Sequence, residues 1–208
     1  LFFYAQHIVI FIALKFKNTM IKNSFLFTAI SLLFSVSSIA QKDAPFTEAM
    51  KKEMCNNEKV ATQHDSKRYK DYAWGADDLK PLTKNAKTWY KTSMLMTPVD
   101  AFDTFTLLGL TTEAKEAKEL ILTKLDFNID NDVQVFEITI RLLAGLLTAY
   151  EMDGDKKFLT LAKDLGDRLM PAFNSKTGMP YRYVHLQTGK TRDGINNPAE
   201  IGTLMMEF

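Results

Sequence analysis

The sequence has almost no cysteine, since Cys55 is the only one among 208 residues. An internal disulfide is therefore excluded, and the fold must depend on its hydrophobic core. Neither charge sign prevails, with 26 Lys and Arg against 25 Asp and Glu, and no basic cluster suggests a nucleic-acid partner. The HExxH zinc motif, paired CxxC motifs, the Walker phosphate loop and the GxGxxG motif are also absent. These absences remove the metalloprotease, P-loop and dinucleotide-binding classes that such motifs mark.

Two long apolar runs lie at the beginning of the chain, at residues 1–16 and 24–40. The second run follows Met20 and ends in small residues, as secretory signal peptides do. We predict a signal peptide that is cleaved near Ala40, preceded by an upstream extension over residues 1–19. The alternative is a membrane anchor, because both runs approach the minimum length of a membrane span. The prediction implies export to a periplasm, a surface or the medium, with membrane contact only through this signal.

The remaining residues, 41–208, are predicted to form one helical domain. Residues 41–70 are polar and become helical towards their end, and a loop follows over 74–96. Thr97 with Pro98, Thr112 and Asp155 are the predicted helix starts, and Gly109 and Gly154 are the predicted stops. The resulting helices are expected over residues 97–110, 113–125, 133–152 and 155–170.

Two kinds of helix alternate in this prediction. Residues 133–150 are apolar on nearly every side, whereas 113–125 and 155–170 each carry one apolar stripe. The short connection between the last two helices makes them antiparallel neighbours, and the alternation is typical of inner and outer helices in a curved αα array. A short β-like segment is expected near 181–186, and a final apolar helix near Pro198.

The most informative feature is a carboxylate and a guanidinium, Glu137 and Arg141, placed one helical turn apart inside the apolar segment. An ionised glutamate there is costly unless it is paired or faces a cavity. The ordinary interpretation is an ion pair that stabilises the helix by about 0.2–0.5 kcal/mol. The functional interpretation adds Glu200, which begins the final helix. Carboxylates that project into the centre of a helical toroid suit glycoside hydrolysis.

Four further aspartates have structural interpretations. Asp100 and Asp103 lie in the first turns of their predicted helix, where negative charge suits the helix dipole, although a functional role is also open. Asp153 and Asp155 flank Gly154, and we interpret the three as a helix stop and a helix cap. A calcium loop of the EF-hand type would need more acidic residues at alternating positions.

Several short motifs occur in an order and spacing that resemble family 47 of the glycoside hydrolases, the class I α-mannosidases. The matching segments are 73–75, 77–79, 81–82, 99–104, 108–110, 135–141, 145–150, 154–155, 158–159, 164–173, 178–181, 199–204 and 207–208. They extend over nearly the whole predicted domain. By this resemblance, residues 41–208 are the N-terminal part of a truncated α-mannosidase catalytic domain.

The resemblance implies an all-α fold, an incomplete (α/α)7 toroid of antiparallel helix hairpins. It also implies an inverting hydrolase that removes α-1,2-linked mannose from high-mannose glycans and uses Ca²⁺ to hold sugar hydroxyls. Glu137 matches the general acid of the family, Arg141 contacts substrate beside it, and Glu200 matches a carboxylate of the sugar cleft. No metal ligand is assigned within this sequence. We expect a monomer.

The family's second essential carboxylates and its calcium-binding threonine would follow Phe208. We therefore expect the 208-residue chain alone to be inactive and poorly folded. Two alternatives remain open: a glycan-binding relative that recognises mannose without cleaving it, and a plain helical scaffold. The sequence departs from the family pattern at Asp78, Ala144, His185 and Pro98, where Glu, Gly, Asn and a residue other than proline are usual.

Overall fold

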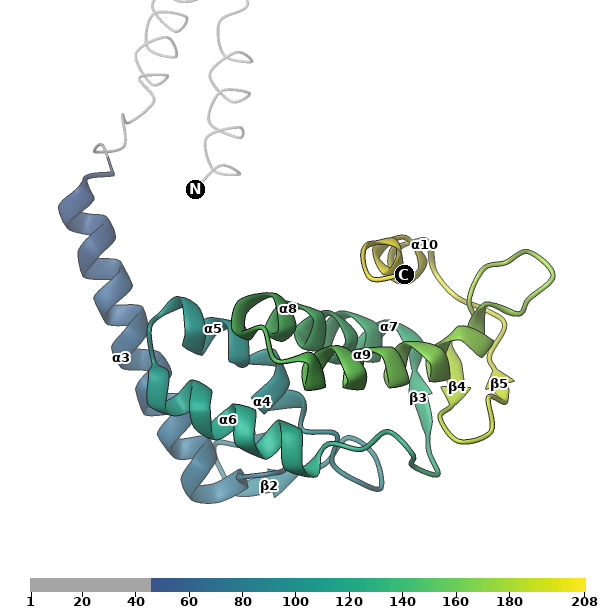
Figure 1. Cartoon of the computed structure of the whole chain (residues 1–208), viewed down its shortest axis with the longest axis horizontal. Coiled ribbons are helices and arrows are strands. Elements are labelled where there is room, and N and C mark those ends of the chain that lie inside the picture. Colours follow the sequence, from purple (N-terminus) through teal and green to yellow (C-terminus); the bar gives the residue numbers. More distant parts are fainter. Residues whose placement is uncertain (1–45) are drawn as a thin grey trace, which may run out of the picture. The chain divides into compact units, whose positions relative to one another are not determined.

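The structure is a computed structural model that describes residues 46–208. The predicted signal peptide and the upstream extension, residues 1–40, lie outside the described residues. Residues Glu48–Phe208 form one compact unit, in which helices predominate and strands are short (Figure 1). The predicted all-α class is thereby confirmed. Within the described residues, no helix has both the length and the apolar character needed to span a bilayer.

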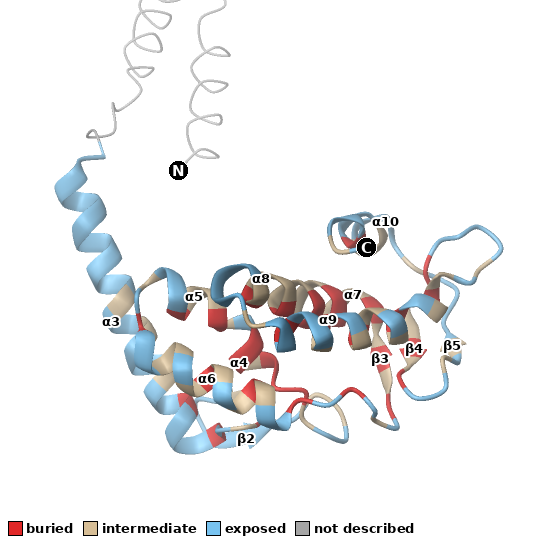
Figure 2. Ribbon diagram, in the orientation of Figure 1, coloured by how far each residue is buried: buried red, intermediate tan, exposed pale blue. Residues whose placement is uncertain are grey.

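The polar stretch at the start of the domain forms one long helix, α3 (Glu48–Ala73). It begins far earlier than the sequence indicated, and its first half is exposed on all sides (Figure 2). Its end is anchored, because the buried Tyr69 donates a hydrogen bond to the carbonyl oxygen of Ala76. The predicted loop over 74–96 was wrong in part, since it contains an antiparallel hairpin. Its strands are β1 (Asp78–Lys80) and β2 (Asn85–Lys87).

The single helix predicted over 97–110 is instead two short helices, α4 (Met96–Asp100) and α5 (Phe102–Leu107). Thr97 is not the cap: α4 begins after Leu95, and the Thr97 hydroxyl donates to the carbonyl oxygen of Asp77 at 2.6 Å. The physical reason is that the distant Asp77 carboxylate accepts the Met96 N–H at 3.2 Å and replaces a local cap. The predicted stop at Gly109 is confirmed by its φ of 64°.

Helix α6 (Thr111–Lys124) follows at once. The predicted cap, Thr112, was wrong, because the helix begins at Thr111, two residues before the predicted start at residue 113, and no side chain caps it. Its predicted apolar stripe is confirmed, with Ala117 and Ile121 fully buried.

The apolar segment predicted as one helix over 133–152 consists of four elements. They are β3 (Asp132–Gln134), α7 (Val135–Ile138), the π-helical turn η1 (Thr139–Leu143) and α8 (Ala144–Asp153). The first residues are extended because β3 pairs antiparallel with the strand β4 (Tyr183–His185). The expectation of burial on every side was also wrong. Leu142 and Leu146 are buried, but the opposite face is half-exposed.

Helix α9 (Lys156–Leu169) agrees closely with its prediction. Gly154 ends α8 with a φ of 80°, and the Asp155 carboxylate caps α9 by accepting the Lys157 N–H at 3.0 Å. The two helices lie side by side and antiparallel (Figure 1). The buried face of α9 consists of Phe158, Ala162, Leu165 and Leu169.

The last part of the chain contains the short elements predicted there. The turn η2 (Met170–Phe173) leads to β4, which confirms the β-like segment, and β4 also pairs with β5 (Thr191–Arg192). Helix α10 (Pro198–Gly202) begins where expected and continues into the turn η3 (Thr203–Met206). The main core lies between α4, α5, α8 and α9, where the rings of Phe102 and Phe158 are 5.2 Å apart.

Candidate active site

The predicted pair forms directly, on the half-exposed face of the α7–α8 segment. Arg141 Nε lies 2.9 Å from Glu137 Oε2, and its Nη1 lies 3.0 Å from Asp100 Oδ2. The side chains of Glu137, Arg141 and Asp100 are 25%, 37% and 36% exposed, so solvent or a ligand can reach all three. One guanidinium therefore joins two carboxylates that are far apart in the sequence.

The charges of this cluster depend on partial burial. Burial raises the pKa of Asp100, and the hydrogen bond from Arg141 opposes that shift. Burial also disfavours the Arg141 charge, but the bonds to Glu137 and Asp100 outweigh it and raise the pKa of Arg141. Arg141 therefore stays charged beside two acidic groups, and the cluster as a whole remains polar on an otherwise apolar helix.

Asp100 reaches Arg141 because α4 and α8 approach each other closely at a glycine. A Cβ atom added at Gly145 would lie 2.7 Å from Val99 Cγ1 and 3.3 Å from the Val99 carbonyl oxygen. Only glycine permits this approach, and Val99 directly precedes Asp100. The departure at Ala144 leaves this contact intact, because Gly145 is the position that packs against α4.

Sequence reasoning missed Trp89, whose ring lies against the Arg141 guanidinium at 5.3 Å from its centroid. The Trp89 indole N–H donates to the Asp78 carboxylate, so the departure at Asp78 lies next to this cluster. The contact of Asp100 with Arg141 was missed as well. No local spacing could reveal either contact. The available signal was the aromatic pair Trp89 and Tyr90 in the segment after two aspartates.

Glu200 is placed differently from Glu137. The Asn197 side chain caps its helix by accepting the Glu200 N–H at 2.9 Å, and the Glu200 carboxylate pairs with Arg182 at 3.3 Å. Its Oε2 atom is buried without a hydrogen-bond partner among the described residues. The turn η3 packs against η1 and buries Leu204 in the core. The structure therefore brings Glu200 to a segment beside the Glu137 helix but pairs it with another arginine.

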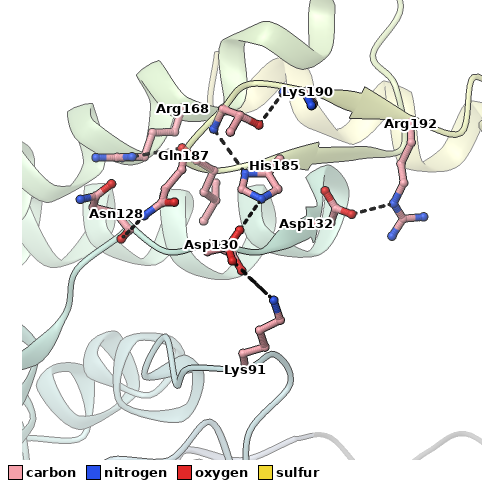
Figure 3. Close-up of polar contacts among 11 residues, drawn as sticks. Lys91, Asn128, Asp130, Asp132, Arg168, His185, Gln187, Lys190 and Arg192 are labelled. Atoms are coloured by element: carbon pink, nitrogen blue, oxygen red, sulfur yellow. Dashed lines mark hydrogen bonds and ion pairs between the residues drawn. The ribbon is translucent and has the colours of Figure 1, made fainter.

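His185, one of the departures from the family pattern, belongs to a separate polar network (Figure 3). His185 Nδ1 lies 3.3 Å from the Thr188 N–H and accepts from it, so Nε2 carries the proton and donates to Asp130 at 2.9 Å. This bond, with the nearby Lys91 ammonium, holds the pKa of Asp130 below its usual range. The network joins the segment before β3 to β4 and is separate from the Arg141 contacts.

The aspartates around Gly154 act as the sequence indicated. Lys118 pairs with Asp153 and, at 3.3 Å, with Asp155, which ties the end of α8 to α6. Within residues 46–208, no group of three His, Cys, Asp or Glu side chains gathers in a way that could hold a metal ion.

The arrangement around Arg141 can perform two tasks. A carboxyl group at partial exposure can donate a proton to a leaving oxygen, and a guanidinium beside it can orient that carboxyl and bind hydroxyl groups. Asp100 adds a second carboxylate to the same guanidinium. Glu200 contributes another acidic group on a neighbouring segment.

The chain is similar to known proteins over most of its length. The family model described as glycosyl hydrolase family 47 matches residues 61–208. A mannosyl-oligosaccharide 1,2-alpha-mannosidase from Arabidopsis thaliana is 39% identical over 173 residues, which is 80% of this chain and 30% of that protein. An endoplasmic reticulum mannosyl-oligosaccharide 1,2-alpha-mannosidase from Rattus norvegicus is 39% identical over 184 residues, or 86% of this chain and 27% of that protein.

A solved structure shows the same relationship. The structure of an alpha-1,2-mannosidase from Trichoderma reesei has a TM-score of 0.67 and 26% sequence identity, over 74% of this chain and 35% of that one. The likeness confirms that the described helices form part of the predicted (α/α)7 toroid. The chain spans 27–30% of the length of the two curated relatives above.

Proposed function

This chain belongs to glycosyl hydrolase family 47, and from that membership we propose that the full-length protein is an inverting α-1,2-mannosidase that trims high-mannose glycans. The observation that carries the proposal is the Arg141 guanidinium joining Glu137 and Asp100 on the accessible face of a core helix. A carboxyl group held in this way is suited to act on a bound sugar.

In the proposed mechanism, Glu137 is the general acid. Because the Arg141 bond goes to Oε2, we assign proton transfer to Oε1, which would protonate the leaving glycosidic oxygen. Arg141 and Glu200 are assigned to substrate binding. Inversion also needs a second carboxyl that activates water, about 6.5–9.5 Å from the acid. The chain spans 27–30% of the length of two curated relatives, so activity is proposed for the full-length protein.

Calcium dependence, export and a monomeric state are further parts of the proposal. The first rests on family membership. No step is assigned here to the ion. Export rests on the apolar run at residues 24–40 with its expected cleavage near Ala40.

The test is the variant Glu137→Gln in the full-length protein, assayed for mannose release from Manα1,2Man. We expect turnover to fall by about 10²–10⁴-fold because the proton donor is lost. Affinity for the disaccharide, measured by calorimetry, should change little because the amide keeps the shape of the carboxyl. The control is Glu119→Gln on the exposed face of α6, which should retain full activity.

Two outcomes would contradict the proposal. A wild-type protein that binds Manα1,2Man without releasing mannose would identify a glycan-binding relative. A Glu137→Gln variant with wild-type turnover would remove Glu137 from the role of acid.

A further inference from the structure

One loop beside the candidate site is held by a single buried carboxylate. Asp77 is 0% exposed, and its Oδ1 accepts hydrogen bonds from the Ser93 hydroxyl, the Met94 N–H and the Met96 N–H at 3.1, 2.7 and 3.2 Å. Its Oδ2 accepts the Trp89 N–H at 2.9 Å. A buried carboxylate that accepts this many hydrogen bonds fixes the backbone around it. Residues 89–96 are therefore rigidly placed.

This loop contacts both ends of the turn that carries Glu137. Tyr90 accepts the N–H of Gln134, the residue before α7, at 3.2 Å through its hydroxyl oxygen. Burial raises the pKa of Tyr90, so the hydroxyl stays protonated. At the other end, the Trp89 ring lies against the Arg141 guanidinium at 5.3 Å. The two neighbouring aromatic residues thus bracket the segment from 134 to 141.

We propose that Trp89 is a positioning residue for Glu137, acting through Arg141. This inference rests on the proposed function. Both carboxylate bonds of Arg141 lie at the edge of its planar guanidinium, and the Trp89 ring supplies an aromatic contact that limits its rotation. Trp89 is itself held by the Asp77 bond to its backbone and the Asp78 bond to its indole. The proton donor is thereby oriented from a loop that lies far from it in the sequence.

A second role for Trp89, as a platform on which a sugar ring stacks, is less favoured by the contacts. The Lys87 ammonium lies 5.7 Å from the same ring, and Arg141 lies 5.3 Å from it. The ring already has two cations against it and is only partly exposed. The two roles predict different kinetics. Loss of orientation lowers kcat, whereas loss of a sugar contact raises KM.

The experiment compares Trp89→Phe, Trp89→Leu and Trp89→Ala in the full-length protein on Manα1,2Man. We expect kcat to fall about tenfold to 100-fold in the alanine variant, as expected for a misplaced catalytic group, with KM within about twofold of wild type. Phenylalanine keeps an aromatic face and should restore most of kcat, whereas leucine keeps bulk alone and should not. The matched control is Trp74→Ala, since Trp74 contacts Lys70 and Tyr69 instead.

A crystal structure of Trp89→Leu supplies a readout that does not depend on activity. We expect the Arg141 guanidinium to leave Glu137 Oε2 or to adopt several orientations. An unchanged Arg141 with wild-type kcat would overturn the inference, as would a raised KM with normal kcat. If the wild-type protein releases no mannose, the proposed function fails, and the position of Arg141 still decides whether Trp89 orients it.

Discussion

Two helical segments, 135–153 and 156–169, lie side by side but differ in regularity and in where their contacts come from. Helix α9 is regular from Lys156 to Leu169, with a side-chain cap and one buried face. The partner segment, from Val135 to Asp153, changes from α-helix to π-helix and back, and carries an ion pair on an apolar helix. The regular segment bears no candidate site residue, and the irregular one bears Glu137 and Arg141.

Helix α9 mainly stabilises the fold, whereas the segment 135–153 carries the candidate site. The cap of α9 is local, and its buried face, which packs into the main core, follows from apolar residues at helical spacing. The other segment depends on distant groups: Val99 packs at Gly145, Asp100 reaches Arg141, and Trp89 lies on the guanidinium. Substitutions in α9 should therefore act on stability, and those in the partner segment should act on geometry and turnover as well.

The largest stability effect is expected from Phe158→Ala. Phe158 is 0% exposed, and its ring lies 5.2 Å from that of Phe102, so truncation should lower the free energy of unfolding by about 3–5 kcal/mol. Urea denaturation of the full-length protein measures this. The control is Leu159→Ala on the exposed face of α9, with a much smaller loss. Equal losses in both variants would contradict the burial described for this helix.

A moderate effect is expected from Gly145→Ala, with a loss of turnover as well. The added methyl would overlap Val99, and overpacking of this kind costs about 1–3 kcal/mol. Moving α4 away should also separate Asp100 from Arg141 and lower kcat. The control is Gly166→Ala in α9, where an added Cβ would have Leu143 Cδ1 as its neighbour at 3.9 Å. It should gain about 0.5–1 kcal/mol. A Gly145→Ala variant as stable and active as wild type would show that close approach is not needed.

The smallest effect is expected at the cap of α9, and it depends on pH. The Lys157 N–H and the nearby Lys118 hold the pKa of Asp155 below its usual range. Because the folded pKa is lower than the unfolded one, the carboxylate stabilises the fold above about pH 4, and this is lost as the pH falls through the folded pKa. Asp155→Ala should therefore lower the melting temperature by a few degrees at pH 7 and much less in strong acid.

Asp155→Asn is the matched control for that prediction. Asparagine also caps helices well, so it should recover most of the melting temperature at pH 7 without the dependence on acid. Calorimetric scans at several pH values compare the three proteins. A deficit in Asp155→Ala that is the same at every pH would assign the effect to something other than the carboxylate charge.

Much of the fold followed from local patterns. The stop at Gly154 and the cap at Asp155 were predictable because their contacts join residues a few positions apart. The buried face of α9 was predictable because its apolar residues recur at helical spacing. The Glu137–Arg141 pair was predictable for the same reason, since its partners are one turn apart. The cap of α4 was not, because Asp77 supplies it from 19 residues away. The strand β3 also escaped prediction, since its partner β4 lies about 50 residues later.

The sequence by itself determined the helical class, the family and the identity of the central ion pair. Tertiary structure alone decided that Asp100 and Trp89 share Arg141 with Glu137, and that Glu200 pairs with Arg182 instead. The physical reason is the separation along the chain between the residues in contact. Capping and helical pairing act within about one turn of chain. The contacts of Arg141 with Asp100 bridge 41 positions and exist only once α4 packs against Gly145.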